Sequence, residues 1–280
     1  MATSKETASA KAPLVGNTVS EGIVIVAVGK EGTPYHVHKA LLIHHSDYFR
    51  KALSGPWKEA REGLVTLEDV EPSTFTIFCH WLYTQKFPEN ESEWEALLSF
   101  DERLDWRDEG LQACAAGYAL GDRLMAQSFR RATIETAVTQ FDGTYFADSG
   151  GRAVTSFAFA TLPASCGLLQ FLGDSYCANS VKDEDSTLAA QDELPRAFLR
   201  RVLLRFQELS LMTDEEQGEE ARCYLEHESE QEKNACEKEH IRYDEKKDLA
   251  IFFQLSSGCI HLKSEALRHV LSQEVRGEAT

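Results

Sequence analysis

The longest uninterrupted apolar run in the sequence, the six residues from Ile23 to Val28, limits the chain to folds that contain a sheet. Most of its side chains are β-branched, and these favour extended backbone. A continuous apolar run of this length is typical of a strand that is covered on both faces. Turn residues at 32–34 separate it from Tyr35–His38, in which polar and apolar side chains alternate. The sequence therefore predicts a β-hairpin over residues 23–38. We expect its apolar first strand at a sheet edge, where unpaired backbone groups invite a second chain.

After the hairpin, the apolar spacing changes from that of a strand to that of a helix. Leu42, Ser46 and Phe49 follow one another at intervals of four and three residues, which predicts a pair of helical segments. A short third strand is expected over residues 64–67, and Pro72 is placed to begin another helix. The element order is strand, strand, helix, helix, strand and helix, which predicts a domain of the α/β (α+β) class.

Helical patterns dominate the rest of the chain. Residues 85–107 are expected to form a long acidic connection with one short helix around 94–100. Further helices are expected over 111–122, 125–138, 154–160, 168–177 and 194–209. The last of these has an apolar stripe bordered by arginines, and we interpret it as packing within its own domain with the arginines paired to acidic residues 214–220. Docking of this helix on an acidic partner or on a membrane surface is the alternative.

The charge distribution suggests how the chain is divided. Residues 211–250 carry 14 acidic and 6 basic side chains, which predicts a solvated acidic arm. Residues 1–19 have no apolar period and are expected to form a disordered tail. The predicted organisation is a tail over 1–19, an α/β domain over 20–140, a helical region over 141–210, and an acidic helical arm with a C-terminal tail over 211–280.

The overall composition disfavours several classes of partner and compartment. With 29 basic and 46 acidic side chains, the net charge is −17, which opposes binding to nucleic acid and to anionic membranes. No apolar run approaches the roughly 20 residues of a membrane span, and the first residues lack the apolar stretch of a signal peptide. The seven cysteines are an odd number without a C-x-x-C pair, which disfavours a disulfide framework. We therefore expect the protein in the cytoplasm, the nucleus or both.

The candidate catalytic motifs are weak. His36, His38, His44 and His45 are close in the sequence, but no acidic ligand accompanies them, so we interpret them as structural histidines rather than as metal ligands. The sequence has no G-x-S-x-G motif, no cysteine in a catalytic context and no phosphate-binding loop. We therefore predict no catalytic residue, no cofactor and no enzymatic activity.

A second group of metal-type residues lies in the acidic arm. Cys223 and Cys236 are each followed four positions later by a histidine, His227 and His240, and these four residues are the ligand types of a tetrahedral zinc site. On one straight helix, thirteen residues turn the chain by about 220°, so the two pairs would face apart. We therefore predict a solvated arm without metal, and a zinc site remains the alternative if the chain bends between residues 228 and 234.

Residues 21–84 resemble a BTB/POZ domain. The resemblance rests on His38, Leu42, Ser46 and Phe49, which keep the family's H-x3-L-x3-S-x2-F spacing, together with the expected strands around them. The helical C-terminal half is similar to that of the many divergent BTB proteins of filamentous fungi. The resemblance implies a small mixed sheet capped by helices, and a non-enzymatic module for binding other proteins.

The resemblance also implies classes of partner. Family members associate with themselves or with another BTB protein through the first strand and first helix, or recruit a cullin so that a bound substrate protein is ubiquitinated. Trp57 and Glu59 lie where the family has its hydrophobic-x-Glu cullin contact, so Trp57 is the expected apolar anchor and Glu59 the expected charged contact.

Several alternatives to this cullin contact remain open. Trp57 could instead close the sheet edge of its own domain, with Glu59 solvated. A transcription-associated BTB scaffold without cullin binding is the alternative function. A small metal-dependent enzyme that uses Cys223 and His227 or the early histidines is more remote. The sequence does not indicate which substrate protein the C-terminal region binds.

Overall fold

The computed structural model describes residues 22–98, 106–141, 149–179, 194–212, 223–227 and 229–236. The chain divides into two compact units. The first comprises residues 1–88 and 117–132, and the second comprises residues 89–116 and 133–280. The predicted tail over 1–19, the acidic residues 214–220 and His240 lie outside the described residues. The predicted fold class, an α+β domain with a small mixed sheet followed by a helical region, is confirmed.

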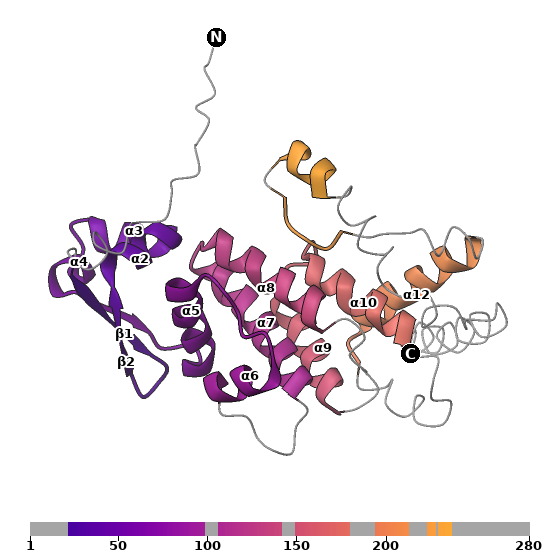
Figure 1. The fold of residues 1–280 in the computed structure, drawn as a ribbon, viewed down its shortest axis with the longest axis horizontal. Helices are drawn as coiled ribbons and strands as arrows, with labels where there is room; N and C mark the ends of the chain where they lie inside the picture. Colours follow the sequence, from indigo (N-terminus) through magenta and orange to yellow (C-terminus); the bar gives the residue numbers. More distant parts are fainter. Residues whose placement is uncertain are drawn as a thin grey trace, which may run out of the picture. The chain divides into compact units, whose positions relative to one another are not determined.

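The sheet of the first unit has three strands in the order β2-β1-β3. Strands β1 and β2 lie side by side in Figure 1. Strand β1 (Ile23–Val28) pairs antiparallel with β2 (Thr33–His38) and parallel with β3 (Leu64–Leu67). β1 is therefore the central strand, and its expected position at a sheet edge is wrong. The sequence could not show this position, because the parallel partner β3 arrives from about forty residues further along the chain.

The two faces of β1 differ in exposure. Val24, Val26 and Val28 are buried, whereas Ile23 and Ile25 are 59% and 38% exposed. The prediction that this strand is covered on both faces is therefore wrong. An unbroken apolar run does not distinguish a strand buried on two faces from a strand whose open face also carries apolar side chains.

Four helices complete the N-terminal part of the first unit. They are α2 (Lys39–His45), α3 (Asp47–Ser54), α4 (Lys58–Glu62) and α5 (Pro72–Thr84). The helical pair expected after the hairpin is confirmed as α2 and α3, and α5 begins at Pro72 as expected. The five-residue helix α4 was not expected, because its residues are mostly charged and carry no apolar period.

Ser46 joins α2 and α3 and is almost completely buried. Its hydroxyl accepts a hydrogen bond from the Phe49 amide at 3.2 Å, which caps the first turn of α3. The same hydroxyl donates to the Leu124 carbonyl oxygen at 2.6 Å. One side chain therefore begins α3 and binds it to a segment nearly eighty residues away.

The core of the first unit is mainly aromatic. Phe78 and Trp81 of α5 lie 4.9 and 5.3 Å, between ring centroids, from Phe129 of α8 (Gln127–Gln140). Helix α7 (Trp106–Arg123) contributes its residues from Gly117 onward to this unit. A Cβ at Gly121 would lie 3.1 Å from the Cβ of Arg130, so the two helices touch where a larger residue would not fit. The tight approach and the aromatic contacts explain why the C-terminal end of α7 and the start of α8 belong to the first unit.

The second unit is helical. Helix α6 (Glu91–Leu98) lies in the connection where a short helix was expected. Helices α9 (Ser149–Thr161), α10 (Gly167–Asn179) and α12 (Arg196–Leu211) contact one another (Figure 1). The apolar stripe of α12 is buried, and its Phe198 contacts Phe159 of α9 and Tyr176 of α10 at ring-centroid distances of 5.4 and 5.2 Å. The prediction that this helix packs within its own domain is confirmed.

None of the helices in the described part of the chain is both long enough and apolar enough to cross a membrane.

Replacing Ser46 with alanine is expected to lower the free energy of unfolding by about 1–2 kcal/mol, because it removes both a helix cap and a buried hydrogen bond. Urea denaturation followed by circular dichroism measures the change. Ser54→Ala, at the exposed end of the same helix, is the control and is expected to have little effect. Equal stability of the two variants would show that the Ser46 hydroxyl does not hold α3 in place.

Candidate partner-binding surface

Trp57 is displayed on the surface of the first unit. Helix α3 ends before Gly55, and Trp57 directly precedes α4. The indole is 59% exposed, and one edge lies against Gly55, where a Cβ would come within 2.5 Å of its Cδ1 atom. The ring can take this position because Gly55 has no side chain. The ring is not buried within its own domain.

Helix α4 carries charged side chains next to this ring. Gly63 ends the helix in the left-handed region at φ 65°, and its N–H donates to the Glu59 carbonyl oxygen at 2.9 Å. Lys58 and Glu62 form an exposed ion pair of 3.6 Å. Glu59 is half-buried, and no side chain among the described residues pairs with its carboxylate. The surface thus presents an apolar ring and, two residues later, a carboxylate available to a basic partner group.

One face of the sheet is open, and strand β3, which contributes to it, follows directly after α4. The Ile25 amide donates to the Gly63 carbonyl oxygen at 2.9 Å, and Ile25 is level with Leu64 across the parallel pair. Their side chains share one face with that of Ile23, and all three are exposed, Leu64 by 39%. We call Ile23, Ile25 and Leu64 the open sheet face. Clustered exposed aliphatic side chains of this kind are typical of a surface that binds another protein.

The four residues of the family motif lie inside the domain rather than on this surface. Leu42 and Phe49 are completely buried, and Ser46 caps α3 as described. His38 is half-buried at the junction of β2 and α2. The Tyr83 hydroxyl lies 2.8 Å from its Nδ1 atom and accepts a hydrogen bond from its backbone N–H at 3.2 Å. The motif therefore serves packing and links the start of α2 to α5.

The early histidines are not gathered around a common centre. The His44 and His45 rings meet edge to face at 4.5 Å, and His45 packs on Trp81 at 5.0 Å between ring centroids. Burial and the neighbouring His44 lower the pKa of His45 to about 4, so the ring is neutral at pH 7. In the described ranges, no group of three or more metal-type side chains includes any of these histidines.

Two cysteines, the half-buried Cys79 and the buried Cys114, offer no nucleophile. Burial raises the pKa of the Cys79 thiol to about 12 and raises that of Cys114 as well. Both thiols therefore stay protonated at physiological pH and lack the reactivity of a thiolate.

The metal-type residues of the acidic arm are placed differently from the prediction. The interpretation that Cys223 and Cys236 face apart on a straight helix is wrong, because residues 223–227 are not helical. The Cys223 sulfur lies 3.5 Å from the His227 Nε2 atom and 3.6 Å from the Cys236 sulfur. The structure thus brings three of the four predicted zinc-type residues together.

Comparison with known families agrees with the arrangement of strands and helices. The family model of the BTB/POZ domain matches residues 23–113, from the first residue of β1 into α7. Residues 23–113 are a BTB/POZ domain. This confirms the resemblance predicted from the spacing of the motif. A search of curated proteins finds no match to the chain. BTB/POZ domains are protein–protein interaction modules, so the chain carries a module of this kind.

The sequence analysis identified only part of the candidate partner-binding surface. Trp57 and Glu59 were found from their place after the second helix, but the open sheet face was not found. Its residues look like core residues in the sequence, and only the strand pairing assigns Ile25 and Leu64 to one uncovered face. Local periodicity carries no signal for that pairing.

The lowered pKa of His45 predicts an acid-dependent loss of stability. Below the ordinary value of 6.5 the unfolded chain binds a proton that the folded ring does not bind until about pH 4. The free energy of unfolding therefore falls as the pH is lowered from about 6.5 to about 4. Urea denaturation at several pH values is expected to show a shallower fall for His45→Gln than for the wild type. His36→Gln, which changes an exposed ring, should keep the wild-type slope. Identical slopes for His45→Gln and the wild type would contradict the assignment.

Proposed function

We propose that the protein is a non-enzymatic adaptor that self-associates and links a substrate protein to a cullin-based ubiquitin ligase. The observation that carries the proposal is the exposed Trp57 indole at the start of α4, where the BTB/POZ family has its cullin contact. The partner of the C-terminal helical region would be the substrate. The cysteine composition supports work in a reducing compartment, the cytoplasm or the nucleus.

Trp57 has the chemistry of an interface anchor. A large aromatic ring that is mostly in water gains free energy when a partner pocket covers it, and such residues dominate the energetics of many interfaces. The ring is already placed by Gly55, so little ordering is needed on binding. The Glu59 carboxylate adds a charged contact for a basic group at the rim of the pocket.

Self-association is supported by the open sheet face. Because β1 is paired on both sides, its backbone cannot recruit a further strand, so a contact through β1 would use the side chains of its open face. Ile23, Ile25 and Leu64 supply exposed aliphatic surface for a second copy of the chain or for another BTB protein. Covering these side chains would remove apolar surface from water at about 25 cal/mol per Å².

Trp57→Ala is expected to weaken binding of a purified cullin N-terminal domain by roughly thirtyfold, which corresponds to about 2 kcal/mol for a desolvated aromatic anchor. The melting temperature should not change, because the ring is exposed. Glu59→Ala should have a smaller effect, and Lys30→Ala, which changes an exposed lysine of the hairpin turn outside residues 57–63, is the control. Calorimetry and thermal denaturation of each variant give both quantities. A wild-type chain that binds no cullin would contradict the adaptor proposal and would favour the transcription-associated scaffold.

Light scattering at micromolar concentration is expected to give twice the chain mass of 31.4 kDa. Ile25→Lys should return the protein to a monomer, because it places a charge in the apolar contact, while the helical circular dichroism stays unchanged. Leu204→Lys changes a side chain of α12 that is 50% exposed, and this control should remain a dimer. A wild-type mass of a single chain would contradict self-association.

A further inference from the structure

Three metal-type side chains meet in the second unit at a place that the proposed adaptor function does not use. The donor atoms of Cys223, His227 and Cys236 all lie within 4.8 Å of one another. They are the only such group of three or more within the described ranges. We propose that these residues supply three of the four ligands of a structural Zn²⁺ ion.

The separations between the donor atoms are those of ligands around one zinc ion. Zinc binds thiolate at about 2.3 Å and imidazole at about 2.0–2.1 Å with tetrahedral angles, which places two sulfurs about 3.8 Å apart and a sulfur and a nitrogen about 3.6 Å apart. The Cys223 sulfur lies 3.6 Å from the Cys236 sulfur and 3.5 Å from the His227 Nε2 atom. A disulfide would instead hold the sulfurs about 2.0 Å apart.

A change of backbone conformation brings the two cysteines together. Residues 223–227 are irregular, and a new helical segment runs over 230–236. Ser229 begins that segment, because its hydroxyl accepts a hydrogen bond from the Glu232 amide at 3.2 Å. Cys223 and Cys236 therefore lie on separate pieces of chain that fold back on each other, and this supplies the bend that a shared zinc site needs.

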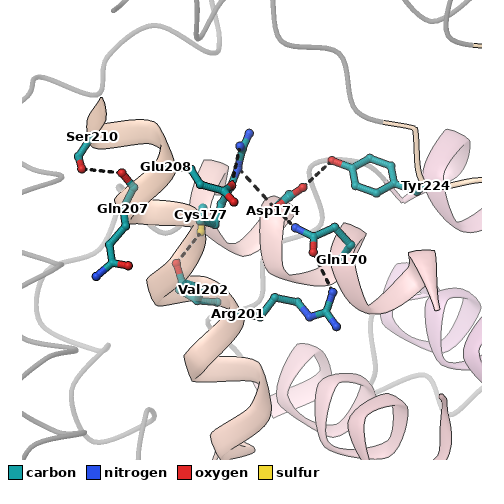
Figure 2. Close-up of polar contacts among 10 residues, drawn as sticks. Gln170, Asp174, Cys177, Arg201, Val202, Gln207, Glu208, Ser210 and Tyr224 are labelled. Carbon is teal, nitrogen blue, oxygen red and sulfur yellow. Dashed lines mark hydrogen bonds and ion pairs between the residues drawn. The ribbon is translucent and has the colours of Figure 1, made fainter. Parts of the chain in front are cut away.

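The first piece is anchored on α10 by Tyr224, which lies between the first two ligands in the sequence. Its hydroxyl donates to Asp174 Oδ2 at 3.0 Å (Figure 2), and its ring meets Phe171 edge to face at 5.5 Å. A Cβ at Gly167 would lie 1.8 Å from the Tyr224 carbonyl oxygen, so the two backbones are in direct contact.

Asp174, whose carboxylate accepts the hydrogen bond from Tyr224, is itself buried in a polar cluster. It accepts a hydrogen bond from the Gln170 amide at 2.8 Å (Figure 2) and lies 3.5 Å from Arg205 Nε of α12. The Tyr224 hydroxyl therefore binds a carboxylate that is already positioned by Gln170 of α10 and Arg205 of α12. These contacts position the backbone on both sides of Tyr224 before any ion binds, and this preorganisation favours a site rather than a loose arm.

Zinc in this position would join the irregular segment to the helical segment over 230–236. Two thiolates neutralise the charge of the ion and the imidazole binds as a neutral ring, so the site adds no charge to a chain that already carries −17. Because such a site does not exist in the unfolded chain, binding of the ion stabilises the folded segment.

Elemental analysis of the full chain, purified under reducing conditions without chelator, tests the proposal. We expect close to one zinc per chain in the wild type and in Cys79→Ser, which changes a cysteine of α5 in the first unit. The double variant Cys223→Ser with Cys236→Ser should lose the metal while keeping the α-helical circular dichroism of the bundle.

Cobalt substitution gives a second readout that does not depend on the fold of that variant. Titration of the metal-free wild-type chain with Co²⁺ should produce thiolate charge-transfer and tetrahedral absorption bands that saturate at one equivalent and disappear on addition of Zn²⁺. His227→Ala should alter the tetrahedral bands. Absence of zinc and of the cobalt bands in the wild type, or equal zinc in the double variant, would overturn the proposal. A Cys223–Cys236 disulfide that persists in the chain purified under reducing conditions would overturn it as well.

Discussion

The buried hydroxyl of Ser46 is the contact on which the arrangement of the BTB/POZ domain depends. It caps α3, lies directly after α2, and donates to the Leu124 carbonyl oxygen just beyond α7. A hydroxyl that is shielded from water must find such partners, so its position fixes the angle at which α2 and α3 meet. With α3 held by Phe49 in the core, the chain emerges at Gly55, and Trp57 and α4 follow on the surface.

The small sheet determines which apolar side chains of the domain are exposed. Three strands bury the valines of β1 on one face and leave Ile23 and Ile25 on the other. Because β3 begins directly after α4, this face and the Trp57 loop arise from consecutive stretches of chain. A single short segment, residues 55–67, thus supplies the candidate anchor, a carboxylate and part of the open sheet face. Such an arrangement suits a module that contacts other proteins.

The spacing of Leu42, Ser46 and Phe49 was sufficient to predict the helical pair, because helix periodicity is a local property of the sequence. The central position of β1 was beyond such reasoning, since it depends on the parallel pairing of Ile25 with Leu64. The meeting of Cys223 with Cys236 was only the alternative prediction for a similar reason. Periodicity assumes one continuous helix, whereas the chain starts a new helical segment at Ser229.

Hydrogen–deuterium exchange of the full chain, alone and with a cullin N-terminal domain, tests the adaptor role most directly. The account predicts slower exchange in residues 57–63, where α4 and its Gly63 cap lie, and unchanged exchange in α5. Helix α4 has no buried residue, so we expect its amides to exchange readily in the free protein and to exchange more slowly when a partner covers them. Protection confined to other segments, or no protection at all, would contradict the central claim that this surface binds the ligase.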